Sequence, residues 1–174
     1  LTTLHAGGKF DNNIYKNSGG LHGVGSSVVN ALSKYMRVQV KRDGNIYEDT
    51  YECGKPTTEL INGLLPVVGK TNKTGTTITF IPDDTIFEKT YFKAEDIKLR
   101  LHETAYLNPE LTIFFEDRRV DPQEKIEFHE PGGLVSFVED INKGRETVHE
   151  VVSFKGTCDD IVLECAFQYI NEIH

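Results

Sequence analysis

The sequence has few cysteines, and their spacing excludes the two usual roles of cysteine clusters. It contains three, Cys53, Cys158 and Cys165, and no Cys-x-x-Cys pair. A disulfide framework needs an even, regularly spaced set, and a structural zinc site needs closely spaced pairs. We therefore expect neither a disulfide-stabilised domain nor a zinc domain, and a reducing compartment fits this composition.

Long apolar runs and an excess of positive charge are also missing. No run approaches the roughly 18 apolar residues of a membrane helix, and no signal peptide opens the sequence, so membrane and secretion are not indicated. The formal net charge is −8, from 19 basic and 27 acidic residues. A surface that binds duplex DNA needs clustered Lys and Arg side chains. We therefore expect any role of this segment with DNA to be indirect.

Common hydrolytic and metal-binding motifs are absent as well. The sequence has no His-Glu-x-x-His and no Gly-x-Ser-x-Gly, and its six histidines are dispersed. Two acidic pairs, Asp83-Asp84 and Asp159-Asp160, fall at predicted turns, where we expect carboxylates to face water rather than to hold Mg²⁺. No metal ligand is predicted within the chain.

Size and composition are those of an ordinary folded domain. The 174 residues are 38% hydrophobic and 10% aromatic, which suffices for one domain, or for one domain and the start of another. The first residue is Leu1 rather than methionine. We expect the chain to be a piece of a longer protein.

What the sequence does contain is a glycine-rich loop that leads directly into an amphipathic helix. Residues 18–33 read Ser-Gly-Gly-Leu-His-Gly-Val-Gly-Ser-Ser-Val-Val-Asn-Ala-Leu-Ser. Gly20, Gly23 and Gly25 let the backbone turn tightly and bring its N–H groups close to a ligand, because no Cβ intervenes. The first helical turn adds unpaired amides and the positive end of the helix dipole. The pattern therefore predicts a phosphate-binding loop.

The spacing excludes the two most familiar phosphate loops. Gly20 and Gly25 have the Walker A glycine spacing, but Ser26 stands where Walker A has a lysine. The dinucleotide fingerprint fails because Gly25 is followed by Ser26 and Ser27 and no strand directly precedes the loop. What remains is Gly-x-x-Gly-x-Gly at a helix start, which by itself also fits a plain loop.

A second glycine-rich segment upstream makes the pattern specific. It reads Leu-His-Ala-Gly-Gly-Lys-Phe at residues 4–10, and Tyr15 and Lys16 follow it. Together, residues 5–33 closely resemble the ATP lid of the ATPase subunits of bacterial type IIA topoisomerases, the family of the DNA gyrase B protein and its topoisomerase IV paralogue. Other members of the GHKL ATPase superfamily, namely Hsp90 chaperones, MutL proteins and sensor histidine kinases, share only the sparse glycine pattern.

The resemblance implies roles for individual residues. Backbone amides of residues 20–26 would wrap the β- and γ-phosphates of ATP, with Lys9 as a phosphate contact and Tyr15 near the ribose. His22 is expected to act through its backbone rather than as a catalytic base. The implied nucleotide-binding residues are Gly8, Lys9, Tyr15, Gly20, Leu21, His22, Gly23, Val24, Gly25, Ser26, Thr76 and Ile78.

Three of the implied roles lie outside the lid. Thr76, within Thr-Gly-Thr at residues 74–76, would help to read adenine through ordered water, and Ile78 would line the same pocket. Arg42 matches a rim arginine that meets coumarin-type inhibitors in the family. Without the resemblance, Thr76 and Ile78 are ordinary strand residues and Arg42 is a cation at a hairpin edge.

Other parts of the family's machinery have no counterpart in this sequence. The resemblance implies a general-base glutamate, an asparagine that holds Mg²⁺ and an adenine-reading aspartate upstream of the lid. It also implies a lysine, in a Gln-Thr-Lys loop, downstream of residue 174. We therefore expect the whole subunit to use ATP and Mg²⁺. We do not expect this piece to hydrolyse ATP by itself.

Periodicity and turn residues predict the order of the helices and strands. A helix follows the glycine loop and ends near residue 34, and alternating strands at 36–42 and 46–51 flank the turn formed by Asp43 and Gly44. We predict a loop-containing connection over 61–73, a strand at 76–81, a helix at 94–107, strands at 111–115 and 125–129, a short helix from residue 134, and strands at 147–154 and 161–169. The residues at 161, 163, 165, 167 and 169 share one face of the last strand.

This order predicts an α+β fold in which helices pack on antiparallel strands. The resemblance implies the GHKL, or Bergerat, ATPase sandwich: a mixed β-sheet with helices on one face, here truncated at its N-terminus. A transducer domain follows it in the family. We expect the partial ATPase domain to cover residues 1–130, and the junction helix and the start of the transducer domain to cover residues 131–174.

The resemblance also implies a function and partners for the parent subunit. ATP would close the lid, join two copies of the subunit into a dimer gate, and couple hydrolysis to the passage of one DNA duplex through another, together with a topoisomerase A-type subunit in the bacterial cytoplasm. Two alternatives are another GHKL ATPase of the chaperone or mismatch-repair type, and a non-catalytic interaction module. Gyrase and topoisomerase IV share the lid, so both stay open, and gyrase is the preferred interpretation.

Overall fold

The computed structural model describes residues 1–2, 23–159 and 161–171. It divides into two compact units, Leu1–Tyr91 and Phe92–His174, which are described separately below. The boundary expected after residue 130 lies inside the second unit and stays a prediction. No helix in the described ranges is long and apolar enough to cross a membrane.

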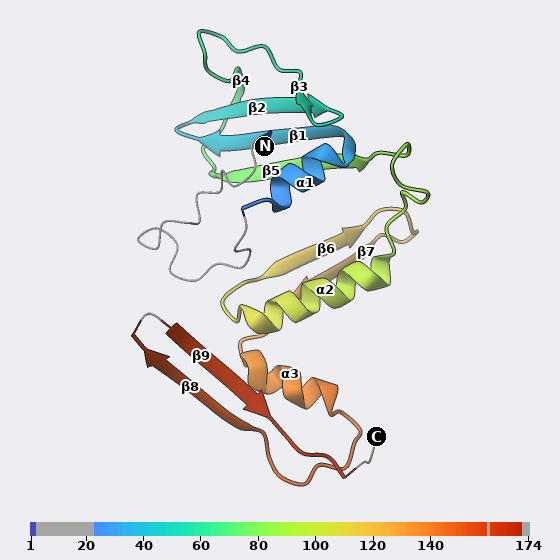
Figure 1. The fold of residues 1–174 in the computed structure, drawn as a ribbon, viewed down its shortest axis with the longest axis vertical. Helices are drawn as coiled ribbons and strands as arrows, with labels where there is room; N and C mark the ends of the chain where they lie inside the picture. Colours follow the sequence, from blue (N-terminus) through green and yellow to red (C-terminus); the bar gives the residue numbers. More distant parts are fainter. Residues whose placement is uncertain (3–22, 160, 172–174) are drawn as a thin grey trace. The chain divides into compact units, whose positions relative to one another are not determined.

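The first unit is a short helix and an antiparallel sheet (Figure 1). Its elements are α1 (Gly25–Ala31), β1 (Ser33–Arg42), β2 (Asn45–Glu52), β3 (Lys55–Pro56), β4 (Val67–Lys70) and β5 (Gly75–Pro82). The strand order is β3-β2-β1-β5, and β4 also pairs with β2. The predicted hairpin is confirmed: Asp43 and Gly44 have φ values of 52° and 77°, which suit a tight turn between right-twisted strands.

Two strands were not expected from the sequence, the two-residue β3 and the longer β4. Residues 61–73 were predicted as a loop-containing connection, but Val67–Lys70 forms β4 on β2, with Asn45 opposite Lys70. At Gly69 a side chain would meet Ile46, because a Cβ there would lie 3.3 Å from the Ile46 Cδ1 atom. Glycine therefore permits the close approach of β4 to β2.

The apolar core of the first unit lies on one face of β1 and its neighbours. Met36 is only 2% exposed and stands opposite Tyr51 of β2 and Phe80 of β5. Directly opposed residues of antiparallel strands project to the same face, so these three side chains are neighbours. Tyr51 is buried as well, whereas Phe80 is partly exposed.

The second unit contains α2 (Ala94–Leu107), β6 (Ile113–Asp117), β7 (Glu124–Phe128), α3 (Gly133–Ile141), β8 (Val152–Cys158) and β9 (Ile161–Phe167). The predicted helix at 94–107 is confirmed, and the other predicted elements are present with shifted boundaries, most of all the strand predicted at 147–154, which is observed as Val152–Cys158. β6 pairs with β7 and β8 with β9, both antiparallel. The α+β fold class is therefore confirmed.

Aromatic packing joins α2 to its neighbours in the second unit. Tyr106 is buried and stacks on Phe137 of α3, with ring centroids 4.9 Å apart. His102, one turn earlier, stacks on Tyr106 at 4.6 Å and forms a 2.7 Å hydrogen bond with Glu130. Burial is the main cause that raises the pKa of Tyr106 to about 12. The end of α2 is thus held by both apolar and polar contacts.

The predicted apolar face of β9 is present but remains largely open to solvent. Ile161 and Leu163 are both exposed in the hairpin formed by β8 and β9. A strand over Ile161–Phe167 is therefore confirmed, but its exposure does not alternate and the described chain does not bury the predicted apolar face.

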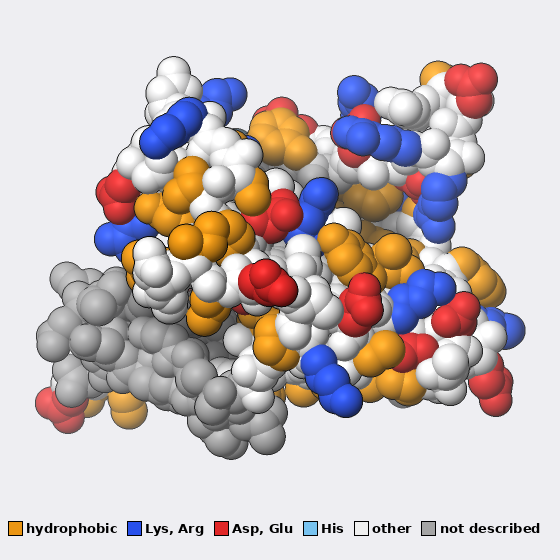
Figure 2. All heavy atoms as spheres, turned by 90° about the horizontal axis from the view of Figure 1, so that it is seen from above, with side chains coloured by type: hydrophobic (Ala, Val, Ile, Leu, Met, Phe, Trp, Pro, Cys, Tyr) orange, Lys and Arg blue, Asp and Glu red, His pale blue; other side chains and the backbone are white. Residues whose placement is uncertain are grey.

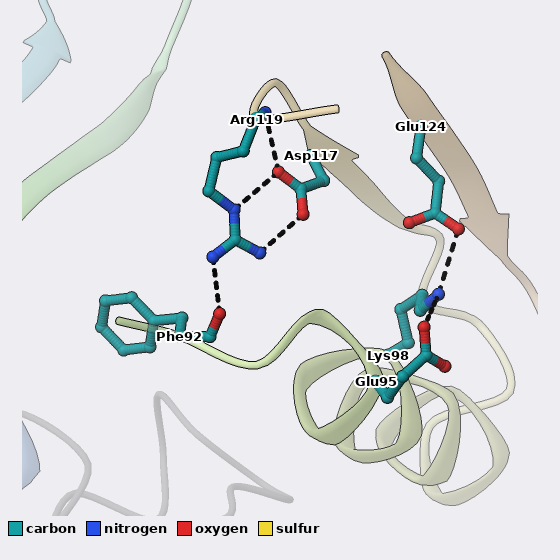
Figure 3. Close-up of polar contacts among 6 residues, drawn as sticks. All are labelled: Phe92, Glu95, Lys98, Asp117, Arg119 and Glu124. Carbon is teal, nitrogen blue, oxygen red and sulfur yellow. Dashed lines mark hydrogen bonds and ion pairs between the residues drawn. The ribbon is translucent and has the colours of Figure 1, made fainter. Parts of the chain in front are cut away.

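The buried carboxylate of Asp117, together with Arg119, connects the first residue of the second unit to the turn between β6 and β7 (Figure 3). Asp117 accepts hydrogen bonds from the Arg119 amide at 2.9 Å and from its guanidinium at 2.8 and 2.6 Å. Arg119 Nη1 also donates to the Phe92 carbonyl at 2.5 Å. One salt bridge reinforces this packing, because Lys98 Nζ lies 3.0 Å from Glu124 Oε1 and links α2 to β7.

Acid should weaken the second unit through Asp117. The hydrogen bonds from Arg119 lower the pKa of Asp117 from 3.8 to about 2. A carboxylate with a lowered pKa in the folded state contributes stability above its unfolded pKa and loses it as the pH falls through the folded value. We expect this contribution to be complete above about pH 4 and to disappear as the pH approaches about 2.

Replacing Asp117 with Asn should lower stability at neutral pH and remove this part of the acid dependence. Urea unfolding followed by hydrogen exchange on peptides of β6 and β7, at neutral pH and near pH 3, measures both effects in the full-length protein. Glu127→Gln, an exposed change on the same hairpin, is the control. Equal acid sensitivity of wild type and Asp117→Asn would contradict the prediction.

Candidate functional site

Gly23 and Val24, the described end of the glycine-rich loop, lead into α1 as the sequence predicts, but the helix ends at Ala31 rather than near residue 34. Gly23 has a φ of 60°, a left-handed conformation that favours glycine, and α1 begins two residues later at Gly25. Val24 is the N-cap, and no side chain caps the helix there. The first helical hydrogen bond runs from the Val28 amide to the Val24 carbonyl at 2.9 Å, so the amides of Gly25 and Ser26 precede it.

The first turn of α1 is accessible. Gly25 and Ser26 are both exposed. A Cβ built on Gly25 would meet no described atom within 4 Å, and the Gly25 φ is not in the left-handed region. Neither packing nor backbone conformation in the described chain therefore requires glycine at this position. Close approach of a ligand to the backbone is another physical reason for glycine at this position.

Six predicted site residues lie outside the described residues. They are Gly8, Lys9, Tyr15, Gly20, Leu21 and His22. The predicted lid contacts that the structure describes are Gly23, Val24, Gly25 and Ser26.

The structure brings the other three predicted residues onto one face of the sheet. Thr76 stands opposite Val40, and Ile78 stands opposite Val38. Arg42 is two residues beyond Val40 on β1, so its side chain projects from the same face. Thr76 is exposed and Ile78 is 53% exposed, which leaves this part of the face open. The strand between β5 and β2 is β1, against which α1 packs.

Arg42 lies at the solvent-exposed end of this face. Its Nε atom is 3.3 Å from Asp43 Oδ2, and both side chains are largely exposed. An exposed pair of this kind is worth at most about 1 kcal/mol. Arg42 can therefore turn toward another anionic or polar group without a large loss of stability.

The expectation that Asp83 faces water is wrong. Asp83 is 6% exposed, and its Oδ1 accepts hydrogen bonds from the Thr85 amide at 2.8 Å and the Thr85 hydroxyl at 2.7 Å. These bonds are the main cause that lowers the Asp83 pKa. Asp84, in contrast, is exposed and pairs with Lys34 at 3.2 Å. Asp83 thus stabilises the turn after β5, where its carboxylate is used locally.

No metal site is evident in this part of the chain. Within the described ranges, no group of three or more His, Cys, Asp or Glu side chains could hold a metal ion. On the face drawn in Figure 2, basic and acidic side chains are interspersed.

One buried polar residue next to the loop was missed by sequence reasoning. Asn30 of α1 is 1% exposed, and its side-chain amide donates to the Gly54 carbonyl at 3.3 Å. The available signal was an asparagine within the apolar stripe formed by Val29, Ala31 and Leu32. A polar side chain in such a stripe is usually hydrogen-bonded when buried.

Curated relatives match nearly the whole chain. The gyrase B protein of Campylobacter jejuni is 50% identical over 169 residues, which cover 97% of this chain and 21% of that protein. The gyrase B protein of Thermotoga maritima is 47% identical over 179 residues, covering 98% of this chain and 27% of that protein. The topoisomerase 4 B protein of Staphylococcus aureus is 45% identical over 174 residues, covering 99% of this chain and 26% of that protein. The chain therefore spans about a quarter of the length of these relatives.

A solved structure with a similar fold agrees with these relatives. The 43K ATPase domain of Thermus thermophilus gyrase B, in complex with an aminocoumarin, superposes with a TM-score of 0.73 at 34% identity. The match covers 85% of this chain and 39% of that one. No protein-family model matches the chain.

Proposed function

We propose that this chain, which belongs to the family of gyrase and topoisomerase IV B subunits, supplies the phosphate-binding and adenine-facing parts of an ATPase domain. The observation that carries the proposal is similarity to named B subunits along nearly the entire chain, with a solved ATPase domain of the same fold. The geometry supports it, because the accessible helix start and the open face with Thr76 and Ile78 belong to the same unit.

The proposed ligand is ATP. Backbone amides of residues 20–26 would hold its β- and γ-phosphates, with Lys9 as a further phosphate contact and Tyr15 near the ribose. Thr76 and Ile78 would contact the adenine end of the nucleotide, and Arg42 would lie at the rim of the nucleotide pocket. The exposed Gly25, where a Cβ would meet no described atom within 4 Å, fits close approach of phosphate oxygens to the backbone.

Mg²⁺ is proposed to accompany ATP and to neutralise charge on its phosphates. We expect its asparagine ligand, and the glutamate that activates water, to come from outside this chain. The residues of this chain would then bind and orient the phosphates and exclude water from them.

For the whole subunit we propose an ATP-dependent topoisomerase of the bacterial cytoplasm. Nucleotide binding would join two copies of the subunit, and hydrolysis would drive passage of a DNA duplex in a complex with an A-type subunit. Residues 131–174 are proposed as the junction helix and the beginning of a transducer domain. A supercoiling assay with the cognate A-type subunit separates gyrase, which introduces negative supercoils, from topoisomerase IV.

Thr76→Val in the full-length subunit tests the nucleotide face. Loss of one neutral hydrogen bond should weaken binding of a non-hydrolysable ATP analogue roughly 3- to 10-fold, measured by calorimetric titration. The matched control is Thr77→Val, because Thr77 is the next residue of β5, is also exposed, and stands opposite Gln39 on the other face.

Equal effects of the two threonine variants would contradict the proposed adenine side. If the full-length wild type neither binds the analogue nor dimerises with it, the alternative of a non-catalytic interaction module is favoured instead.

A further inference from the structure

A buried asparagine fixes the helix that follows the glycine loop. The Asn30 Nδ2 atom lies 3.3 Å from the Gly54 carbonyl oxygen and 3.4 Å from the Leu1 carbonyl oxygen. Two carbonyl acceptors on the same side require the donor end of the amide there. The other end, Oδ1, is buried and has no hydrogen-bond partner among the described residues. Asn30 therefore links α1 to the first residue of the chain and to the turn after β2.

The position of α1 depends on such links. The helix has seven residues, and isolated helices of this length are not stable in water. Its C-terminal end is held by a 3.0 Å hydrogen bond from the Asp83 amide to the Leu32 carbonyl. Gly54 lets the turn approach the end of the helix, because a Cβ there would lie 3.3 Å from Ala31 Cα. Asn30 adds the directional contact at this close approach.

Apolar contacts alone would allow α1 to shift along its neighbours. Hydrogen bonds weaken steeply when distance or angle changes, so the Asn30 amide restricts this movement. The amides of Gly23 to Ser26 are at the other end of the same short segment. A shift of α1 would therefore misalign several donors toward a bound anion at once.

We propose that Asn30 is a positioning residue for the nucleotide phosphates, which it does not touch. This inference rests on the proposed function, because it assumes that the loop before α1 binds those phosphates. It predicts that a change at Asn30 weakens contacts with the triphosphate and leaves contacts with the adenosine part, on β5, nearly unchanged.

The test compares two ligands on the full-length subunit. Asn30→Ala should weaken binding of a non-hydrolysable ATP analogue roughly tenfold, while the affinity for adenosine, followed by NMR titration, changes less than about twofold. Asn30→Asp keeps the side-chain volume but replaces the donor with an acceptor. It should weaken binding of the analogue at least as much as Asn30→Ala and leave the affinity for adenosine nearly unchanged, whereas a role in packing alone would weaken binding of both ligands together.

Ser33→Ala is the matched control. Ser33 is also buried, and its hydroxyl donates to the Val29 carbonyl at 2.6 Å at the end of α1, so its loss removes a local hydrogen bond without releasing the turn. Ser33→Ala should leave the affinities for the ATP analogue and for adenosine unchanged.

The possible outcomes are distinct. An equal loss of affinity for both ligands would overturn the positioning role. Wild-type affinity of folded Asn30→Asp for the analogue would overturn it as well. Failure of the wild-type subunit to bind the analogue would refute the proposed function, and the inference with it.

Discussion

Replacing Gly25 with Ala in the full-length subunit should weaken ATP binding by about 10- to 100-fold without unfolding the protein. Hydrogen bonds from the backbone to a charged phosphate contribute about 1.5–3 kcal/mol, and a methyl group in front of the amides would hold the phosphate away. The fold should tolerate the change, because the added Cβ meets no described atom within 4 Å and alanine favours helix over glycine. Calorimetric titration with a non-hydrolysable ATP analogue measures the loss.

Gly156→Ala provides a matched control for this prediction. Gly156 lies in β8, and a Cβ there also meets no described atom within 4 Å. Both substitutions add one methyl group that meets no atom of the described residues, but Gly156 is in the second unit and outside the proposed phosphate loop. Wild-type affinity in the folded Gly25→Ala variant would refute close approach of the phosphates to this residue.

Met36→Ala should destabilise the first unit by about 2–5 kcal/mol. Met36 is 2% exposed in the central strand β1, and truncation of a fully buried side chain loses its burial and leaves a cavity. The neighbouring strands are held in register on both sides, so they cannot readily close over the gap. Hydrogen exchange on peptides of β1 during urea unfolding of the full-length protein measures the loss locally.

Ile78→Ala separates burial from the proposed binding role. Ile78 projects from the same face as Met36 but is 53% exposed, so its truncation should cost less than about 1 kcal/mol. It should nevertheless weaken binding of the ATP analogue, because Ile78 is proposed to line the pocket. A loss of stability as large as that of Met36→Ala would show that Ile78 is needed for the core instead.

Local patterns predicted those elements whose structure is decided by neighbouring residues. The hairpin of β1 and β2 follows from alternating side chains and the Asp-Gly turn, and α2 follows from apolar residues at four-residue steps before Asn108 and Pro109. The resemblance of the chain to the ATPase subunits of type IIA topoisomerases is likewise confirmed by the relatives and the solved structure. Long, specific motifs and strong periodicity were sufficient for these conclusions.

Interactions between distant residues could not be predicted in the same way. β4 has four residues and exists because the edge of β2 accepts it, which its own glycine-containing sequence does not reveal. Asp83 was expected to face water, but its carboxylate is buried and accepts hydrogen bonds from Thr85. Asn30 gave no functional signal, since its partners Gly54 and Leu1 are far from it in the sequence.

The sequence by itself determined the fold class, the resemblance to type IIA topoisomerase ATPase subunits and the helix start after Gly23, because turn chemistry, periodicity and a long motif depend on adjacent residues. Only the tertiary structure decided that Thr76, Ile78 and Arg42 share one open face, since strand register selects the side on which each residue projects. It also decided which polar side chains are buried, because burial depends on segments that meet only when the chain is folded.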